Sequence, residues 1–192
     1  MADLNAALIA IAGVLAGGYV NNFLAEDYKR FRDGRALAGA LAGELESHGE
    51  ALPMLKIGLT MMEEMTRGGQ KLNMPEWPMP VSPLFDENAS KIGQLGPDLA
   101  KGVAYVYENL RAFRLNFHQL SKHHGNMPPE WSHATVLGCL AAIQRAETTG
   151  APLIESLKSY ADARYLSRPE TKTQLKYCAA AFIVFLLVVK IL

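Results

Sequence analysis

The sequence lacks the short motifs that usually mark an enzyme. It has no G-x-x-x-x-G-K-[ST] phosphate loop, no G-x-G-x-x-G fingerprint, no G-x-S-x-G elbow and no C-x-x-C pair. Only two of its 192 residues are cysteine, Cys139 and Cys178, too few for a disulfide framework or a cysteine-based zinc site. Nucleotide hydrolysis, dinucleotide redox chemistry and α/β-hydrolase chemistry therefore have no recognisable site, and we expect no cofactor.

An excess of charge of either sign is also missing. The chain has 19 Lys and Arg and 19 Asp and Glu, so its net charge is zero, and this balance disfavours nucleic acid as a partner. The basic residues instead gather in two groups of four, each on the inner side of an uncharged apolar run. The groups are Lys29, Arg30, Arg32 and Arg35 after the first run, and Arg164, Arg168, Lys172 and Lys176 before the second.

The two apolar runs predict helices that cross a lipid bilayer. About 20 helical residues span the hydrocarbon core, and residues 4–25 and 173–192 are each long enough. A cleaved signal peptide or an Ala-rich soluble helix is the alternative for the first run, but no basic residue precedes Lys29, unlike the start of a signal peptide. Because Lys and Arg are retained in the cytoplasm, we expect residues 26–172 in the cytoplasm and both termini outside, as in a bacterial inner-membrane protein.

The middle of the chain, residues 26–172, is expected to form one helical bundle. Its clearest helix starts at Pro97, where apolar residues are spaced alternately four and three apart, the pattern of a helix with one buried face. These residues are Leu99, Val103, Val106, Leu110, Phe113, Phe117 and Leu120. Glycine and proline predict breaks elsewhere: at Gly49 and Pro53, at Gly150, and in a proline-rich loop over residues 70–83 that a short helix at 84–95 follows. The predicted fold is all-α, a membrane-anchored helical bundle with a transmembrane helix at each end.

Two pairs of small residues, each pair four positions apart, lie in the first predicted span. They are Ala6, Ala10, Gly13 and Gly17. Small side chains at this spacing let two helix backbones approach closely in lipid. The stripe therefore predicts contact either with a second copy of the chain, which would make a homo-oligomer, or with the C-terminal span of the same chain.

A polar group on the helix that starts at Pro97 could be catalytic. Arg111, Arg114 and His118 share one helix face, and the segment RAFRLNFH, from Arg111 to His118, resembles the R-x4-6-H signature of the HEPN superfamily. That resemblance implies an all-helical ribonuclease in which Arg111 or Arg114 would act with His118 at a dimer interface. The alternative is that the three residues form a solvated polar edge of a core helix.

Histidines are concentrated near the end of the same helix. His118, His123 and His124 lie within seven residues, and His133 follows them. No pair matches H-x-x-x-H or H-E-x-x-H, and no Asp or Glu lies between Ser121 and Met127. We therefore expect no metal site, and we expect histidines at this helix end to be solvated.

Two apolar segments could contact a partner protein. Met54, Met61, Met62 and Met65 could line a soft groove that accepts a partner helix, or they could pack in the core. Trp77 lies in the proline-rich loop and could fold back onto the bundle or act as an exposed anchor.

The layout of the chain resembles a loose group of uncharacterised bacterial and prophage-type proteins. The similar segments are KRFRDGRALAGALAGELE at residues 29–46 and PLFDENASKIGQLGPDLAKGVAYVY at residues 83–107. The resemblance implies a membrane-anchored helical topology and no particular activity. Phage-defence systems often use small membrane-anchored proteins. By analogy with these, we expect an oligomeric interaction or effector module that binds a protein partner or perturbs the lipid bilayer. The alternatives are a membrane-anchored HEPN-like ribonuclease and an oligomeric pore.

Overall fold

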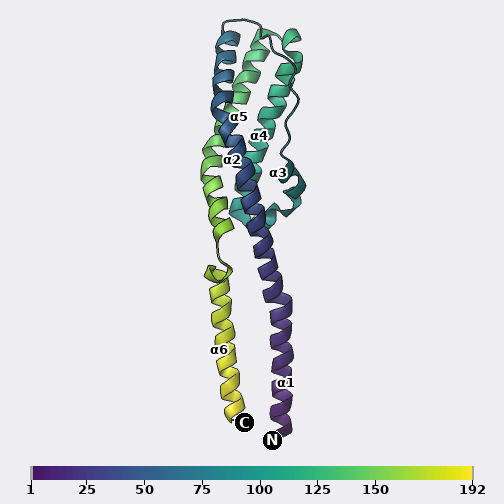
Figure 1. Cartoon of the computed structure of the whole chain (residues 1–192), viewed down its shortest axis with the longest axis vertical. Helices are drawn as coiled ribbons and strands as arrows, with labels where there is room; N and C mark the ends of the chain where they lie inside the picture. Colours follow the sequence, from purple (N-terminus) through teal and green to yellow (C-terminus); the bar gives the residue numbers. More distant parts are fainter. Residues whose placement is uncertain (1, 192) are drawn as a thin grey trace. The chain divides into compact units, whose positions relative to one another are not determined.

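Every regular element of the described chain is a helix. The computed structural model describes the backbone of residues 2–191, without the side chains at 2–6, 8, 16, 20, 21 and 188–191. The elements, shown in Figure 1, are α1 (Ala2–Tyr19), η1 (Val20–Leu24), α2 (Ala25–Arg67), α3 (Pro83–Asn88), η2 (Ala89–Leu95), α4 (Pro97–His123), η3 (His124–Asn126), α5 (Pro129–Asp162), η4 (Tyr165–Ser167) and α6 (Pro169–Ile191). The predicted all-α fold is confirmed.

The chain divides into two compact units. The terminal unit comprises Met1–Arg35 and Asp162–Leu192, and the bundle unit comprises Ala36–Ala161. The predicted soluble bundle had wider limits, residues 26 and 172. The residues that differ, 26–35 and 162–172, belong to the terminal unit.

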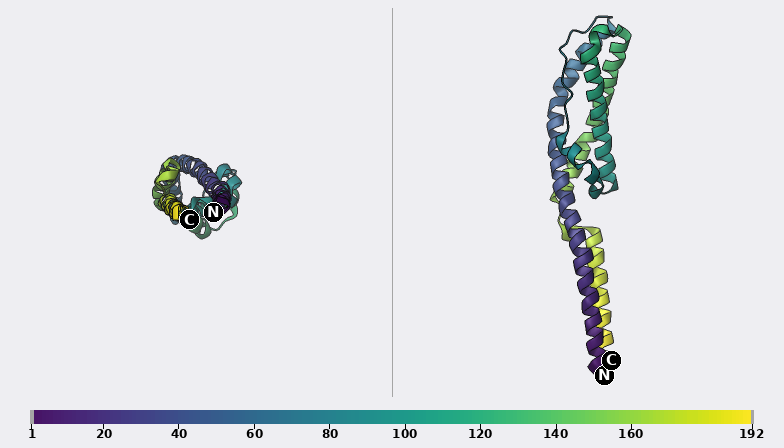
Figure 2. Two further views of the ribbon diagram at one scale, coloured as in Figure 1. Left: turned by 90° about the horizontal axis from the view of Figure 1, so that it is seen from below. Right: turned by 90° about the vertical axis from the view of Figure 1, so that its right-hand side faces the viewer.

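Three long helices, α2, α4 and α5, lie side by side in the bundle unit (Figures 1 and 2). The apolar stripe of α4 contributes to the core between them. In this stripe Val103, Val106, Leu110, Phe113 and Leu120 are buried, and Leu99 and Phe117 are partly buried. The predicted stripe is therefore confirmed. Burial of a leucine or phenylalanine side chain contributes about 1.5–3 kcal/mol, so this face alone can hold α4 in place.

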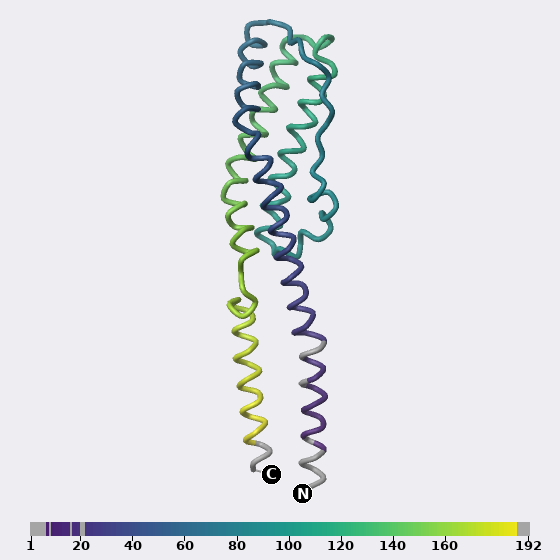
Figure 3. The backbone as a smooth tube through the Cα atoms, viewed as in Figure 1, coloured from purple at the N-terminus to yellow at the C-terminus, as the bar shows by residue number. Residues whose placement is uncertain are grey.

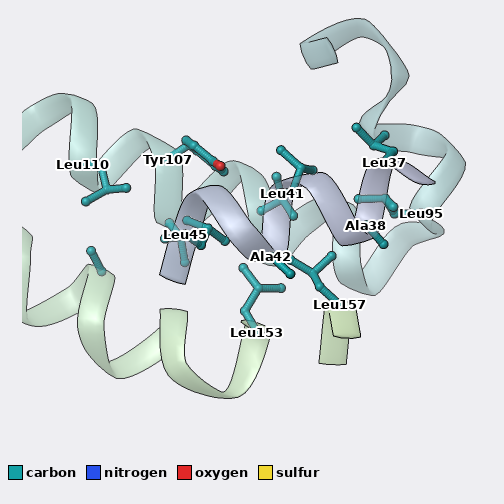
Figure 4. Packing of buried hydrophobic residues seen from close by; sticks show 13 residues of the cluster. Leu37, Ala38, Leu41, Ala42, Leu45, Leu95, Tyr107, Leu110, Leu153 and Leu157 are labelled. Carbon is teal, nitrogen blue, oxygen red and sulfur yellow. The ribbon is translucent and has the colours of Figure 1, made fainter. Parts of the chain in front are cut away.

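The core of the bundle unit consists of two clusters. In the first, shown in Figure 4, Leu41 and Leu45 of α2 face Leu153 and Leu157 of α5, and Tyr107 of α4 closes the third side. The second cluster lies nearer the loop that follows α2 and contains Leu52, Leu59, Leu72, Phe113, Leu120, Val136, Cys139, Ala142 and Ile143. Burial raises the pKa of the Cys139 thiol to about 12, which makes it an inert packing group.

The predicted break at Gly49 and Pro53 is wrong, because α2 continues through both residues. A proline inside a helix costs about 3 kcal/mol through a lost hydrogen bond and a steric clash. The ring of Pro53 is exposed, so water can solvate the carbonyl that it leaves without a donor. Burial of Leu52 and Leu59 on the opposite face exceeds the remaining cost.

The predicted break at Gly150 is also wrong, because α5 runs through Gly150 and the exposed Pro152. Gly150 is buried, and a Cβ there would lie 3.8 Å from Cγ1 of Val106. Gly150 also borders a cavity of about 210 Å³ between α2, α4 and α5. Here the glycine serves close packing of two helices and does not end one.

The predicted loop is present over residues 68–82 and runs from the end of α2 along α4 to α3, as the tube in Figure 3 shows. Gly69, with φ of 73°, turns the chain after α2, a conformation that glycine adopts without steric cost. The predicted helix at 84–95 consists of a short α-helix, α3, and the 3-10 segment η2. Gly96, with φ of 84°, then sets the direction of α4.

In the terminal unit, α1 and α6 run in opposite directions (Figures 1 and 2). One helix of the described chain, Ile9–Arg67, contains a stretch long and apolar enough to cross a membrane, and none of that stretch is buried. The length and composition of this stretch are thus compatible with a membrane-spanning helix near the N-terminus. The predicted C-terminal span, with side chains 188–191 outside the described set, stays a prediction.

Candidate functional site

An apolar groove lies between α2, the loop over residues 68–82 and α4, and we treat it as the candidate functional site. Its volume is about 290 Å³. The groove is lined by Met54, Leu55, Gly58, Leu59, Met62, Trp77, Pro78, Pro80, Phe113, Arg114, Phe117 and His118. The α2 residues recur at intervals of three and four, so they share one helix face. Gly58 provides depth, because no atom lies within 4 Å of the place where its Cβ would be.

The loop wall of the groove is held against α4 by the backbone of Trp77. Its N–H donates to Oγ of Ser121 at 3.3 Å, and its carbonyl accepts from Nδ1 of His118 at 3.0 Å. The indole ring meets Phe117 edge to face, with ring centroids 6.2 Å apart. Trp77 still exposes 53% of its surface. It therefore folds back onto the bundle and also remains accessible at the rim of the groove.

A polar network holds the end of the same loop. Arg114 donates from Nη1 to Oγ of Ser82 at 2.7 Å and from Nη2 to Nε2 of His48 at 3.2 Å. A guanidinium group can only donate, so Nε2 of His48 accepts and the imidazole is neutral with its proton on Nδ1. Burial, followed by the charge of Arg114, lowers the pKa of His48, which favours this neutral form. Burial also lowers the pKa of Arg114.

Glu44 completes the network from α2. Its Oε1 accepts from the N–H of Leu84 at 3.0 Å, and its Oε2 accepts from the N–H of Phe85 at 3.2 Å and from the hydroxyl of Tyr107 at 2.7 Å. The rings of Phe85 and Tyr107 stack at 3.9 Å. Burial, together with the Glu44 carboxylate, raises the pKa of Tyr107. These bonds satisfy a buried carboxylate and fix the start of α3.

The three residues of the candidate ribonuclease signature do not all line the groove. The guanidinium of Arg111 is 79% exposed and pairs with Glu108 at 3.6 Å. Arg114 and His118 both line the groove, but each is bonded to the loop. The geometry assigns Arg114 and His118 a role in holding the loop, while Arg111 lies outside the groove.

Sequence reasoning missed Glu44, His48, Ser82 and Tyr107, which make most of the network. One signal was present, since Glu44 lies three residues after Leu41 and therefore on the buried face of α2. Its partners are 40 or more residues away, and no local pattern links them.

The predicted partner-binding residues are distributed over two faces of α2. Met54 and Met62 line the groove, whereas Met61, which is 60% exposed, and Met65 lie on the surface beside it. An exposed apolar stripe with spacings of three and four runs along α2 through Met54, Ile57, Met61 and Met65. The apolar surface is thus wider than the groove itself.

The histidines do not assemble into a ligand cluster. His133 Nδ1 lies 3.1 Å from Oγ1 of Thr66, and His124 Nδ1 lies 3.0 Å from the carbonyl of Ser121. Over the described residues, no group of three or more His, Cys, Asp or Glu side chains could hold a metal ion.

The stripe of small residues in α1 is open to its surroundings. Ala10, Gly13 and Gly17 are exposed, and no atom lies within 4 Å of a Cβ built on either glycine. The side chain of Ala6 lies outside the described set.

Comparisons with known proteins add no relative: no family model, no curated protein and no solved structure matches this chain.

Proposed function

We propose that this protein is a membrane-anchored helical module that acts by binding a partner protein in the groove between α2, the loop and α4. The observation that carries the proposal is the groove itself, a preformed apolar site whose loop wall is fixed by Trp77, Ser82 and Arg114. Preformed sites lose little conformational entropy on binding.

Anchoring is supported by the apolar surface of the terminal unit. None of the candidate span in Ile9–Arg67 is buried, unlike the core helix of a soluble protein. In α6, Phe182, Ile183, Val184, Leu186 and Leu187 are each more than half exposed. Apolar surface in water costs about 25 cal/mol per Å², so lipid is the solvent that suits both helices.

The proposed topology has both termini outside and the bundle in the cytoplasm of a bacterial cell. It follows from the two basic groups on the inner side of each run. A membrane-impermeant maleimide, applied to intact cells, should label Ala2→Cys and spare Asn126→Cys in a Cys178→Ser background. Label on Asn126→Cys alone would contradict the topology.

The partner that fits the groove is an amphipathic helix with apolar residues at helical spacing and one carboxylate. Methionine and aromatic side chains adapt to such a face. The described lining contains no acidic residue and two basic or titratable ones, Arg114 and His118, on the same wall. Charge complementarity therefore selects an acidic group at the end of the apolar face.

Binding can be tested with a designed peptide probe and a matched pair of glycine variants. The probe carries Leu and Phe at helical spacing and ends in Glu, and its control ends in Lys. Gly58→Leu fills the groove, whereas Gly43→Leu makes the same change at another open position of α2. In fluorescence anisotropy, the wild type and Gly43→Leu should prefer the Glu peptide about tenfold. Equal binding by both variants would overturn the proposal.

Oligomerisation through α1 is part of the proposal. The open surface at Gly13 and Gly17 supports it, because close backbone approach in lipid needs such a surface. Cross-linking of detergent-purified protein should yield a dimer or larger species that Gly17→Leu removes. An oligomeric pore would add ion leakage to this result.

The ribonuclease alternative predicts a different outcome. Cleavage of RNA by purified protein, lost in Arg114→Ala and His118→Ala but kept in Met61→Ala, would favour it over partner binding.

A further inference from the structure

A basic pocket lies in the terminal unit, between the first turns of α2 and a second wall made by Arg164, η4 and the first turn of α6. Its volume is about 550 Å³. Four cationic side chains line it: Arg32, Arg35, Arg164 and Lys172. Among the described residues that line the pocket, none is acidic.

Nearby acidic residues do not neutralise this pocket. Asp27 accepts from Nη1 of Arg168 at 3.2 Å and from the Tyr165 hydroxyl at 2.8 Å, and Glu170 lies 3.8 Å from Arg168. Both carboxylates thus pair with Arg168, which does not line the pocket. Glu26 is bonded in the same way to Arg30, also outside it.

The exception is Asp33, which lies outside the lining and pairs with Arg32 of the lining at 2.9 Å. Arg164 and Lys172, in contrast, form no ion pair with any side chain that the structure describes. Two cations of the pocket are therefore without a counter-charge from the protein.

Aromatic contacts fix the shape of the pocket. Tyr165 packs edge to face on Tyr28, with ring centroids 5.3 Å apart, and lies 5.5 Å from Phe31. The guanidinium groups of Arg168 and Arg35 lie 5.1 and 5.7 Å from the Phe31 ring. These contacts hold cations close together although like charges repel, which is the arrangement of a preformed anion site.

We propose that this pocket binds the phosphate of an anionic phospholipid headgroup. Arginine and lysine bind phosphate oxygens through charge-assisted hydrogen bonds. Two observations favour a lipid over a phosphate in solution. Leu166 and Tyr28, both more than half exposed, border the site and can contact acyl chains. Lys172 also lies next to residue 173, where the predicted C-terminal span begins. The proposal rests on the membrane anchoring proposed above.

The test uses the full-length chain in nanodiscs of phosphatidylcholine, with or without phosphatidylglycerol. Native mass spectrometry counts retained lipid, and a thermal scan gives the unfolding midpoint. Phosphatidylglycerol should be retained preferentially and raise the midpoint. The double variant Arg164→Gln, Lys172→Gln should reduce this retention about tenfold or more, since each basic residue near an anionic surface contributes about 1 kcal/mol.

A matched control removes the same charge outside the pocket, in Lys29→Gln, Lys176→Gln. Retention close to wild type in this control supports the site, whereas an equal loss in both variants would show unspecific attraction and overturn it.

Inorganic phosphate added to phosphatidylcholine discs should leave the midpoint unchanged, and an equal rise would assign the pocket to a soluble phosphate instead. Equal stability in both kinds of disc refutes the headgroup site but leaves the anchoring intact. A chain that enters neither disc refutes both.

Discussion

The two units of this protein use the same secondary structure against different surroundings. In the bundle unit, Leu157 of α5 is 0% exposed because α2 and α4 cover it. In the terminal unit, Phe182 of α6 is 61% exposed, and its neighbours are equally uncovered. An apolar helix face needs a partner of low polarity. Protein supplies it in the bundle unit, and we propose that lipid supplies it in the terminal unit.

The two units also differ in the surroundings of their polar and charged side chains. The bundle unit buries Glu44 and half-buries Arg114 and His48, and each of these side chains has hydrogen-bond partners in the protein. The terminal unit places its cations at the inner end of each apolar run, and most of them are exposed. Buried polar groups require partners fixed by the fold, whereas exposed cations do not.

The largest expected effect is the loss of core packing in the bundle unit. Leu157→Ala should lower the free energy of unfolding by about 2–5 kcal/mol, because it removes buried surface and leaves a cavity. The same truncation in α6, Leu175→Ala, should change the stability of the bundle little, since Leu175 is 46% exposed. Denaturant unfolding followed by circular dichroism measures both. Equal losses would mean that α6 is packed as a core helix.

A charge within α6 should break the terminal unit and spare the bundle. Ile183→Arg places a cation near the middle of the predicted span, at a cost of about 2.5–3.5 kcal/mol for insertion. We expect a larger share of the protein in the soluble fraction of lysed cells. Ser159→Arg, an exposed position of α5, introduces the same side chain in the bundle unit and should leave the distribution unchanged.

The loop of the bundle unit should loosen in mild acid. The pKa of His48 is lowered below its ordinary value of 6.5, so the unfolded chain binds the proton more tightly and stability falls as pH falls below 6.5. Protonation would also place a positive His48 next to Arg114.

The measurement is hydrogen exchange of the loop amides between pH 7 and pH 5, corrected for intrinsic rates. His48→Gln keeps an acceptor for Arg114 and should flatten the pH dependence. His123→Gln, a change at an exposed histidine, should leave it as in the wild type. A slope that survives in His48→Gln would assign the titration to another group.

The smallest expected effect is a gain in the free energy of unfolding of the bundle unit. Gly150→Ala adds a methyl group at ordinary contact distance, 3.8 Å from Val106, and removes the entropic cost of glycine in a helix. It should stabilise the bundle by about 0.5–1 kcal/mol. Gly102→Ala, whose Cβ would lie 2.9 Å from Cδ1 of Leu153, should gain less, and a thermal scan compares the two variants.

Local patterns in the sequence determined the helical fold, the buried face of α4 and the course of the proline-rich loop. The alternation of four and three along α4 is set by helix geometry, so it could be read without knowing any neighbour. The same applies to the apolar runs at the two ends, because a long uncharged run needs an apolar environment of some kind.

Only the tertiary structure decided that α2 and α5 pass through Gly49, Pro53 and Gly150. A local rule assigns each of these residues a cost. Burial of Leu52 and Leu59 outweighs it in α2, and burial of Leu153 and Leu157 outweighs it in α5. Tertiary structure alone also brought Glu44 to Tyr107 and Arg114 to Ser82, which are 63 and 32 residues apart in the chain. Contacts over such separations depend on how the helices pack, and helix packing is a property of several segments together.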